Sequence, residues 1–174
     1  DTYYELQLQL AFLDEDDNII IFDQRNSNIL LFDSIGNFIR RIGTKGHGSD
    51  EYLEFSDIAY DKETRTIYAF ERFCEQMYVF DLNGELKQRI SSNFNFNSFV
   101  KNEYGFWIYS CYSKNNPNKS LLMLVDESLT EIKKEYFQQK NINNVQFTSR
   151  FTENINNGKQ YFYYDGSNNI WELS

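Results

Sequence analysis

The sequence of 174 residues predicts an all-β protein, a β-propeller of four-stranded antiparallel blades. The first observation is a repeat. Residues 32–42 (FDSIGNFIRRI) return 48 positions later as residues 80–90 (FDLNGELKQRI), with five of eleven residues identical. The second is that each period holds three or four apolar runs of about five residues, separated by Asp, Asn, Gly and Ser clusters. Four short strands in about 45 residues are typical of a propeller blade.

The apolar runs near the middle of each repeat give a physical reason for this fold. The runs NIIIF, NILLF, MYVF and LLMLV are continuously apolar, which is expected of strands covered on both faces. Blades stacked face to face give their inner strands such cover. The last run of each repeat (NFIRRI, ELKQRI) carries Arg, Lys and Gln and is predicted to form a charged outer edge.

The repeats divide one predicted domain, 1–174, into about 3.75 blades. We expect blade 1 at about 3–42, blade 2 at about 55–90, blade 3 at about 96–137 and an incomplete blade 4 at about 146–174. The expected strands are 5–13, 19–23, 29–33 and 37–42, then 57–60, 66–71, 76–81 and 85–90, then 98–101, 106–111, 120–126 and 130–136, then 146–153, 160–164 and 169–173.

One stretch of blade 3 gives two opposed signals. Ser128 and Glu131 have the spacing of a helix capping box, and Leu129, Ile132 and Tyr136 fall on one helical face. The register of the repeat predicts a strand there instead. We follow the register, because tertiary context often overrides local preference.

The charge of the chain excludes some classes of partner. The net charge is −9 and no Lys/Arg run is longer than two, so we predict no nucleic-acid partner. A spanning helix needs about 20 apolar residues, so no transmembrane segment is predicted either. Because the sequence begins at Asp1 inside the first blade, we expect a processed form or a part of a longer protein. Cys74 and Cys111 fall at different phases of their repeats, so a disulfide is not implied.

Residues 38–61 (FIRRIGTKGHGSDEYLEFSDIAYD) resemble the six-bladed β-propeller family of Bacteroides-type bacteria, itself similar to NHL repeats. The family pattern is roughly F-I-R-x-I-G-x-x-G-x-G-P-G-E-Y, and this chain has Ser49 and Asp50 in place of Pro-Gly. Residues 23–33 (DQRNSNILLFD) resemble the NHL signature D-x-x-N-x-R-I-x-x-F-D, with Asn28 where the Arg would be. The resemblance implies a six-bladed parent about twice as long. It also implies an extracytoplasmic location, in the periplasm or at the cell surface, often with a lipid anchor as in lipoproteins.

Residues 43–56 connect blade 1 to blade 2 and contain the loop candidates His47, Asp50 and Glu51. A phosphate cradle would require a helix N-terminus after the glycines, whereas a strand follows. We therefore expect a structural crossover, in which Glu51 accepts backbone hydrogen bonds and Tyr52 packs between blades. His47 is the only His, and a lone His cannot build the usual zinc site.

The turns between second and third strands should share one face with this crossover. Asp23, Glu71 and Asp165 then occupy comparable positions near the channel mouth, where three carboxylates could hold Ca²⁺; no other cofactor is predicted. The alternative is that each caps its own turn. The remaining ligand-binding candidates on these turns are Arg25, Arg72, Phe73 and Tyr112.

Aromatic residues near the turns have two interpretations. They could form a surface on which sugars or peptides stack, or they could pack between blades as part of the core. The residues in question are Phe73, Tyr109, Tyr112, Tyr163, Tyr164 and Trp171.

Three functions remain open. The first is a non-enzymatic extracytoplasmic binding or scaffold propeller that engages a protein, peptide or glycan through its loop face, since no nucleophile–base pair or metal cluster stands out. The second is a metal-dependent lyase or lactonase with an acidic site at the channel mouth. The third is a structural module that closes a ring by self-association through open blade edges.

Overall fold

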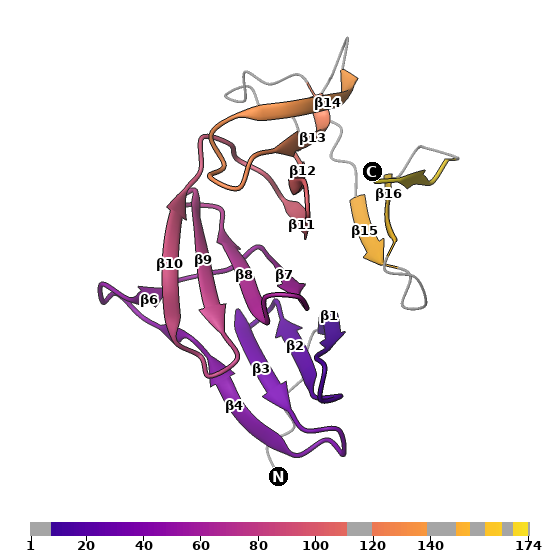
Figure 1. Ribbon diagram of the computed structural model, residues 1–174. Helices are drawn as coiled ribbons and strands as arrows, with labels where there is room; N and C mark the ends of the chain where they lie inside the picture. Colours follow the sequence, from indigo (N-terminus) through magenta and orange to yellow (C-terminus); the bar gives the residue numbers. More distant parts are fainter. Residues whose placement is uncertain (1–7, 111–119, 139–148, 154–158, 165–168, 174) are drawn as a thin grey trace. The chain divides into compact units, whose positions relative to one another are not determined.

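The computed structural model describes residues 8–110, 120–138, 149–153, 159–164 and 169–173. Every regular element in these ranges is a β-strand, and neighbouring strands within each blade are antiparallel. The chain divides into two compact units, Asp1–Ser92 and Asn93–Ser174, with two blades in each (Figure 1). The prediction of four-stranded antiparallel blades is confirmed for blades 1 to 3.

The first unit contains all eight strands that the repeats predict. Blade 1 consists of β1 (Leu8–Leu13), β2 (Ile19–Asp23), β3 (Asn28–Phe32) and β4 (Phe38–Ile42). Blade 2 consists of β7 (Asp57–Asp61), β8 (Thr66–Glu71), β9 (Gln76–Asp81) and β10 (Leu86–Ser91). In both blades the strands pair in chain order, so the last strand forms the outer edge.

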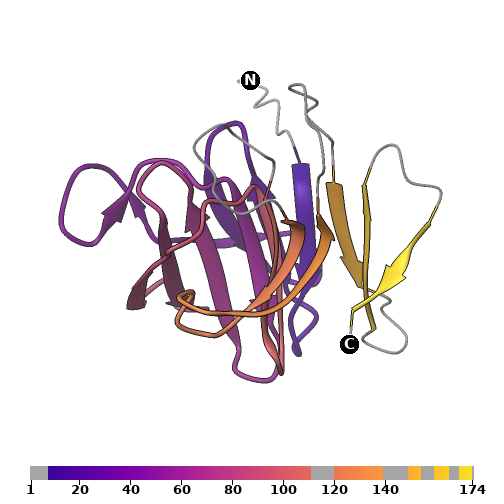
Figure 2. The ribbon, with the colours of Figure 1, turned by 90° about the horizontal axis from the view of Figure 1, so that it is seen from above.

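The crossover between these blades contains two short strands that the sequence does not predict. In the crossover, β5 (Thr44–Lys45) pairs in parallel with β6 (Glu51–Tyr52). Figure 2 shows this part of the crossover as a loop that projects away from the strands of the first unit. The projecting loop therefore has its own backbone pairing.

Side chains from both blades and from the crossover form the core of the first unit. Tyr52 and Phe55 stack with their ring centroids 4.0 Å apart, and Phe55 meets Tyr78 edge to face at 5.4 Å. Tyr52 is fully buried, which is the packing that the sequence predicts for it. The other buried members are Ile20, Phe22, Ile29, Leu31, Ile42, Ile58, Tyr60, Ile67, Ala69 and Phe80.

The turn between the third and fourth strands is clamped by the same aspartate in three blades. Asp33 Oδ1 accepts the Asn37 amide at 2.7 Å, and Asp81 Oδ1 accepts the Glu85 amide at 3.0 Å. Asp126 Oδ1 accepts the amides of residues 130 and 131, each at 2.8 Å. The Asp that recurs after each apolar run therefore closes the hairpin to the edge strand.

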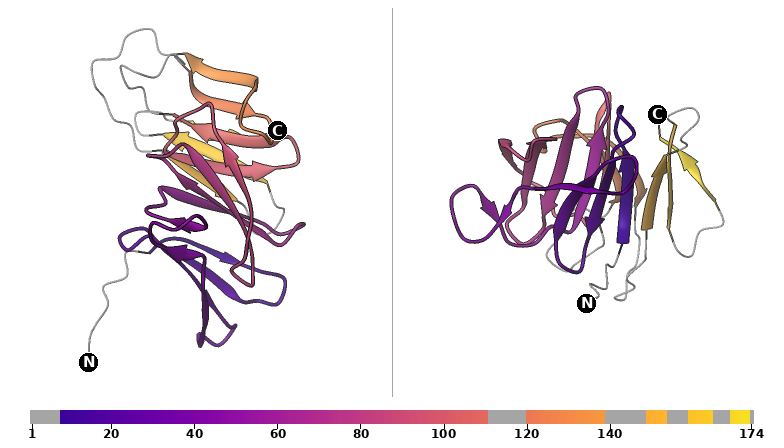
Figure 3. Two further views of the ribbon diagram at one scale, coloured as in Figure 1. Left: turned by 90° about the vertical axis from the view of Figure 1, so that its left-hand side faces the viewer. Right: turned by 90° about the horizontal axis from the view of Figure 1, so that it is seen from below.

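The second unit repeats the blade twice. Its four-stranded sheet contains β11 (Ser98–Asn102), β12 (Gly105–Tyr109), β13 (Ser120–Val125) and β14 (Ile132–Gln138); its three-stranded sheet contains β15 (Ser149–Glu153), β16 (Gln160–Tyr164) and β17 (Trp171–Glu172). Figure 3 shows the strands of each sheet from two further sides.

The strand β14 confirms the prediction that residues 130–136 form the fourth strand of blade 3 and not a helix. Asp126 accepts the backbone amides of residues 130 and 131, which a helix that starts at Ser128 would leave for its own cap.

Candidate functional site

Two turns and the crossover meet at one end of the first unit. We call this surface the turn face; it consists of the β2–β3 turn (24–27), the β8–β9 turn (72–75) and the crossover (43–56). The Lys45 ammonium group donates to the Asn26 carbonyl at 3.2 Å, and the Gln24 side-chain amide donates to the Ser56 carbonyl at 3.3 Å. The structure thus brings the β2–β3 turn and the crossover together, as the sequence predicts.

Four consecutive backbone amides of the crossover are bound by the two blades. The Leu53 and Glu54 amides donate to Glu71 Oε1 at 3.0 and 3.2 Å. The Phe55 amide donates to Ser27 Oγ at 2.6 Å, and the Ser56 amide donates to the Phe70 carbonyl at 2.8 Å. Because backbone donors seldom remain unpaired in a protein interior, these bonds fix the path of the crossover across the turn face.

Glu71 is the central acceptor of this network. Its side chain is only 2% exposed, and Glu71 Oε2 accepts the Tyr78 hydroxyl at 2.9 Å. Burial raises the pKa of Tyr78 to about 12, with further contributions from the hydrogen bond to Glu71 and from its charge. Tyr78 therefore stays protonated and donates to the carboxylate over the physiological pH range.

Arg89 of β10 supports the same region from the outer strand. Its guanidinium lies 4.7 Å from the centroid of the Tyr78 ring, and it donates to the Glu51 carbonyl at 3.3 Å. Such a contact contributes about 0.5–1 kcal/mol at exposed sites and more where the groups are desolvated, as the buried Tyr78 ring is. The edge strand of blade 2 is thus connected to the crossover.

Asp23, the counterpart of Glu71 in blade 1, bonds within its own turn. It is buried, and it accepts the Asn26 backbone amide at 3.3 Å and the Asn26 side-chain amide at 2.6 Å. The third acid of the predicted triplet, Asp165, lies outside the described residues. Across the described ranges, no group of three or more His, Cys, Asp or Glu side chains is placed to hold a metal ion. Calcium binding stays a prediction.

The side chains that the turn face presents to solvent include two large apolar ones. Phe73, in the β8–β9 turn, is 81% exposed, and Leu53, in the crossover, is 43% exposed. Arg25 and Arg72, which the sequence also singles out, are exposed in the two turns. Tyr112 lies outside the described residues. The turn face therefore combines apolar contact area with cationic side chains.

The other aromatic candidates divide differently. Tyr109 is buried and Trp171 is half-buried against the core of the second unit, as the core-packing interpretation predicts for these two. Tyr163 is half-buried on β16. Among the described candidates, Phe73 is the one whose exposure favours binding, since its side chain in the β8–β9 turn is exposed.

The projecting part of the crossover is held together by Glu51. Its carboxylate accepts the Gly48 amide at 2.7 Å, and a Cβ added at Gly46 would overlap the same carboxylate. This is the structural role that the sequence predicts for Glu51. His47 and Asp50 are exposed on the loop.

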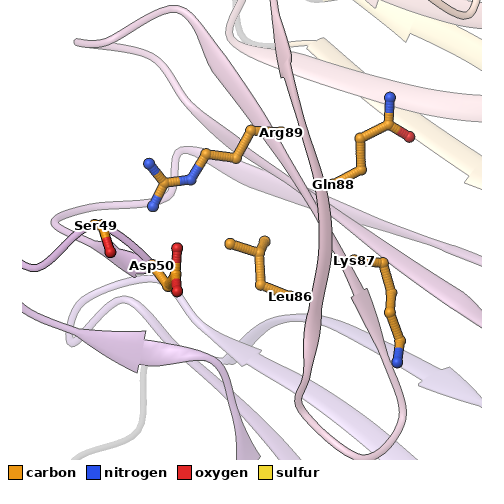
Figure 4. A pocket seen from close by; sticks show the side chains of 6 residues that line it. All are labelled: Ser49, Asp50, Leu86, Lys87, Gln88 and Arg89. Atoms are coloured by element: carbon orange, nitrogen blue, oxygen red, sulfur yellow. The ribbon is translucent and has the colours of Figure 1, made fainter.

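A shallow cleft lies between this loop and β10. Its volume is about 310 Å³, and its lining residues are Ser49, Asp50, Leu86, Lys87, Gln88 and Arg89. In Figure 4 the Arg89 side chain extends toward Ser49 and Asp50 on the same side of β10 as Leu86, whereas Lys87 and Gln88 point away from that side. The cleft is therefore lined mainly by polar and charged side chains, with Leu86 as its apolar member.

Sequence reasoning missed Ser27 and Leu53 at the turn face. Ser27 is a buried turn residue whose left-handed backbone (φ 54°) recurs at Glu75 (φ 53°), the equivalent position of the next blade. Leu53 had a usable signal, because it is an apolar residue next to an acid in a loop. Its backbone amide donates to Glu71 Oε1, a bond that only the structure shows.

Four-stranded antiparallel blades in tandem, together with loops that gather at one end of the strands, define the chain as a β-propeller protein. It belongs to the family described as "Domain of unknown function (DUF4934)", whose model matches residues 12–174. No protein of curated function matches the sequence.

Crystal structures of other proteins share the fold. A "Putative exported protein" from Bacteroides fragilis superposes with a TM-score of 0.81 at 18% identity, over 99% of this chain and 50% of that one. A member of the DUF4221 family from Bacteroides vulgatus gives 0.65 at 12% identity, over 98% and 57%. The C-terminal WD40 domain of Sif2 gives 0.54 at 11% identity, over 98% and 45%. The chain thus spans about half the length of the structures that it matches. No helix in the described ranges is long and apolar enough to cross a membrane.

Proposed function

We propose that this chain is a non-enzymatic binding propeller that engages a protein, peptide or glycan through the turn face. The observation that carries the proposal is Phe73, an aromatic side chain 81% exposed to solvent in a turn. That turn follows directly on Glu71, whose carboxylate is buried and fully engaged. The exposed ring therefore extends from an anchored base.

An anchored aromatic side chain suits binding for two physical reasons. Aromatic rings bury about 150–250 Å² each, so one ring supplies much of the contact energy of a small interface. A ring on a turn whose backbone is already fixed loses little conformational entropy when a ligand stacks on it. Arg25 and Arg72 place positive charge in the same two turns, which favours ligands that carry carboxylate groups.

We place the protein outside the cytoplasm. Support comes from the name of the Bacteroides fragilis protein, which describes it as exported, and from the family resemblance in residues 38–61. A six-bladed, lipid-anchored parent with NHL-like repeats belongs to the same proposal. The neighbours of greater length are compatible with further blades.

The metal-dependent lyase or lactonase has no comparable support in the described residues. Such an enzyme needs carboxylate oxygens open to a cation or substrate. The described acids of the predicted triplet, Asp23 and Glu71, each accept at least two hydrogen bonds from protein donors. A binding role does not require free carboxylate oxygens on the turn face.

The test is a binding screen followed by two matched substitutions. Labelled protein is applied to glycan and peptide arrays, and the best ligand is titrated by calorimetry. Phe73→Ala is compared with Tyr104→Ala, which removes another exposed aromatic side chain at the β11–β12 turn, outside the turn face. We expect Phe73→Ala to weaken binding at least about tenfold, as a hot-spot residue does. Equal affinity of the two variants, or turnover of the ligand by the wild type, would contradict the proposal.

A further inference from the structure

The projecting loop of the crossover is longer than a connection between two blades requires. Residues 92–97 connect blade 2 to blade 3, whereas residues 43–56 connect blade 1 to blade 2. The longer connection contains the parallel strands β5 and β6 and the loop between them. Connections that exceed the usual few residues commonly carry a binding function. The cleft between this loop and β10 is therefore a candidate site, and all of its lining residues belong to the first unit.

The loop forms one wall of the cleft, and its backbone is held in place. The pairing of β5 with β6 closes its base, and the Glu51 carboxylate accepts the Gly48 amide at 2.7 Å. Ser49 and Asp50, which lie between these two residues, are exposed and line the cleft. Within the described residues, the Asp50 side chain has no ion pair and accepts no hydrogen bond. The loop thus presents a carboxylate without a partner from a fixed backbone.

The opposite wall owes its side chains to a β-bulge in β10. The register of β10 against β9 shifts between Leu86 and Gln88. A bulge inserts one extra residue into a strand and re-aims the side chains beside it. Leu86 and Arg89 accordingly point to the same side of β10, whereas Lys87 and Gln88 point away from it (Figure 4). The bulge therefore directs one cationic and one apolar side chain toward the loop.

The Arg89 guanidinium is positioned by the protein, yet most of its donors remain available. It lies 4.7 Å from the centroid of the Tyr78 ring and donates to the Glu51 carbonyl at 3.3 Å. In the part of the chain that the structure describes, no carboxylate forms an ion pair with it. Because a guanidinium carries several N–H donors in a planar fork, this single bond leaves donors for a ligand.

Opposite charges therefore face each other across the cleft without a direct ion pair between them. A carboxylate matches Arg89, because its two oxygens accept the planar fork in a bidentate manner. An ammonium group matches Asp50, because it supplies donors to a group that only accepts. A ligand with both groups has no net charge, so the net charge of −9 on the chain does not repel it. The cleft volume of about 310 Å³ lies at the lower end of small-molecule sites, about 300–1,000 Å³.

We propose that the cleft binds a small zwitterion of the amino-acid type, with its carboxylate on Arg89, its ammonium group on Asp50 and its apolar part over Leu86. This site is additional to the turn-face binding proposed above, because Phe73 does not line the cleft. The same two charges occur in a free amino acid and, farther apart, at the two ends of a short peptide. Tighter binding of alanine than of alanyl-alanine would assign the ligand to the first source, and the reverse order to the second.

Calorimetric titration of the full chain with alanine, propionate and alaninamide tests the proposal, since the last two each lack one of the charges. We expect alanine to bind and each analogue to bind at least about tenfold more weakly, as the loss of a hydrogen bond between charged groups predicts. Asp50→Asn and Arg89→Gln should weaken alanine binding by a similar factor. The matched controls Glu63→Gln and Arg41→Gln remove the same charges at exposed positions outside the cleft and should bind alanine as the wild type does.

Three results would overturn the proposal. One is a wild type that does not bind alanine or alanyl-alanine, or that binds propionate and alaninamide equally well. Another is a control variant that weakens binding as much as Asp50→Asn does. The third is loss of binding in Phe73→Ala with retention in Asp50→Asn, which would assign the ligand to the turn face. Because Arg89 also contacts Tyr78, hydrogen exchange of the crossover peptide verifies the fold of Arg89→Gln. Asp50→Asn makes the same test from a side chain without a partner in the described residues.

Discussion

Replacing Glu71 by Ala removes the acceptor of three donors at once, namely the Leu53 and Glu54 amides and the Tyr78 hydroxyl. A hydrogen bond to a charged acceptor contributes about 1.5–3 kcal/mol, and a buried donor left unpaired costs about 1–3 kcal/mol. Because residues 53 and 54 lie at the surface, their amides can recover water, whereas the Tyr78 hydroxyl is buried. We expect a loss of about 3–4 kcal/mol in the free energy of unfolding.

Urea unfolding followed by far-ultraviolet circular dichroism measures this loss, and hydrogen exchange by mass spectrometry locates it. The peptide that contains residues 53–56 should exchange faster in Glu71→Ala. Glu71→Gln keeps one oxygen for the two amides and should lose roughly half as much stability. Glu63→Ala, an exposed acid in the β7–β8 turn, is the control and should stay within about 0.5 kcal/mol of wild type. The reasoning is wrong if Glu71→Ala is as stable as Glu63→Ala and its crossover amides remain protected.

Three further substitutions test other contacts of the fold. Tyr78→Phe should cost about 1–3 kcal/mol, because it leaves one oxygen of Glu71 without its donor. Because the pKa of Tyr78 is raised to about 12, the protonated hydroxyl stabilises the fold below about pH 10, and this contribution is lost as the pH rises toward 12. In urea titrations the free energy of unfolding of Tyr78→Phe should therefore fall less with alkaline pH than that of the wild type. Desolvation by burial raises the pKa of the Asp126 carboxyl, but hydrogen bonds from Ser128 and from the backbone of the turn outweigh it, so the pKa is lowered overall. The ionised carboxylate therefore stabilises the fold above about pH 4, and this contribution is lost as the pH falls. Asp126→Asn should consequently make the free energy of unfolding less sensitive to acid. Gly84→Ala should lower the melting temperature more than Gly36→Ala: both residues have positive φ (86° and 88°), but only at Gly84 would the added Cβ meet a backbone oxygen, at 3.1 Å.

The strands could be predicted because the information that specifies them is local and repeated. β2, β8 and β9 have the predicted bounds, since each is an apolar run of five or six residues bounded by turn residues. The repeat register outweighs the helical signal at residues 128–137, because the repeat puts an Asp before the turn as in the other blades, and the structure has a strand there. Repetition thus supplies tertiary information that a single segment lacks.

The turn face could be predicted only in part. Its location follows from blade topology, and the role of Phe73 in binding stays a prediction. The hydrogen bonds that build it join Glu71 to residues 17 and 18 positions away and Ser27 to a residue 28 positions away. No periodicity in the sequence encodes such pairs. Strands of two residues, such as β5 and β6, are likewise too short to leave a pattern.

A chain made of similar blades has an assembly problem, because equivalent strands could pair with the wrong neighbours during folding. Asp23 and Glu71 occupy the same repeat position but differ by one methylene group. Among the described residues, Asp23 accepts hydrogen bonds within its own turn, whereas the longer Glu71 side chain also reaches the segment that enters its blade. In the second blade, the additional methylene group of Glu71 places its carboxylate against the segment that enters that blade, where it accepts two backbone amides.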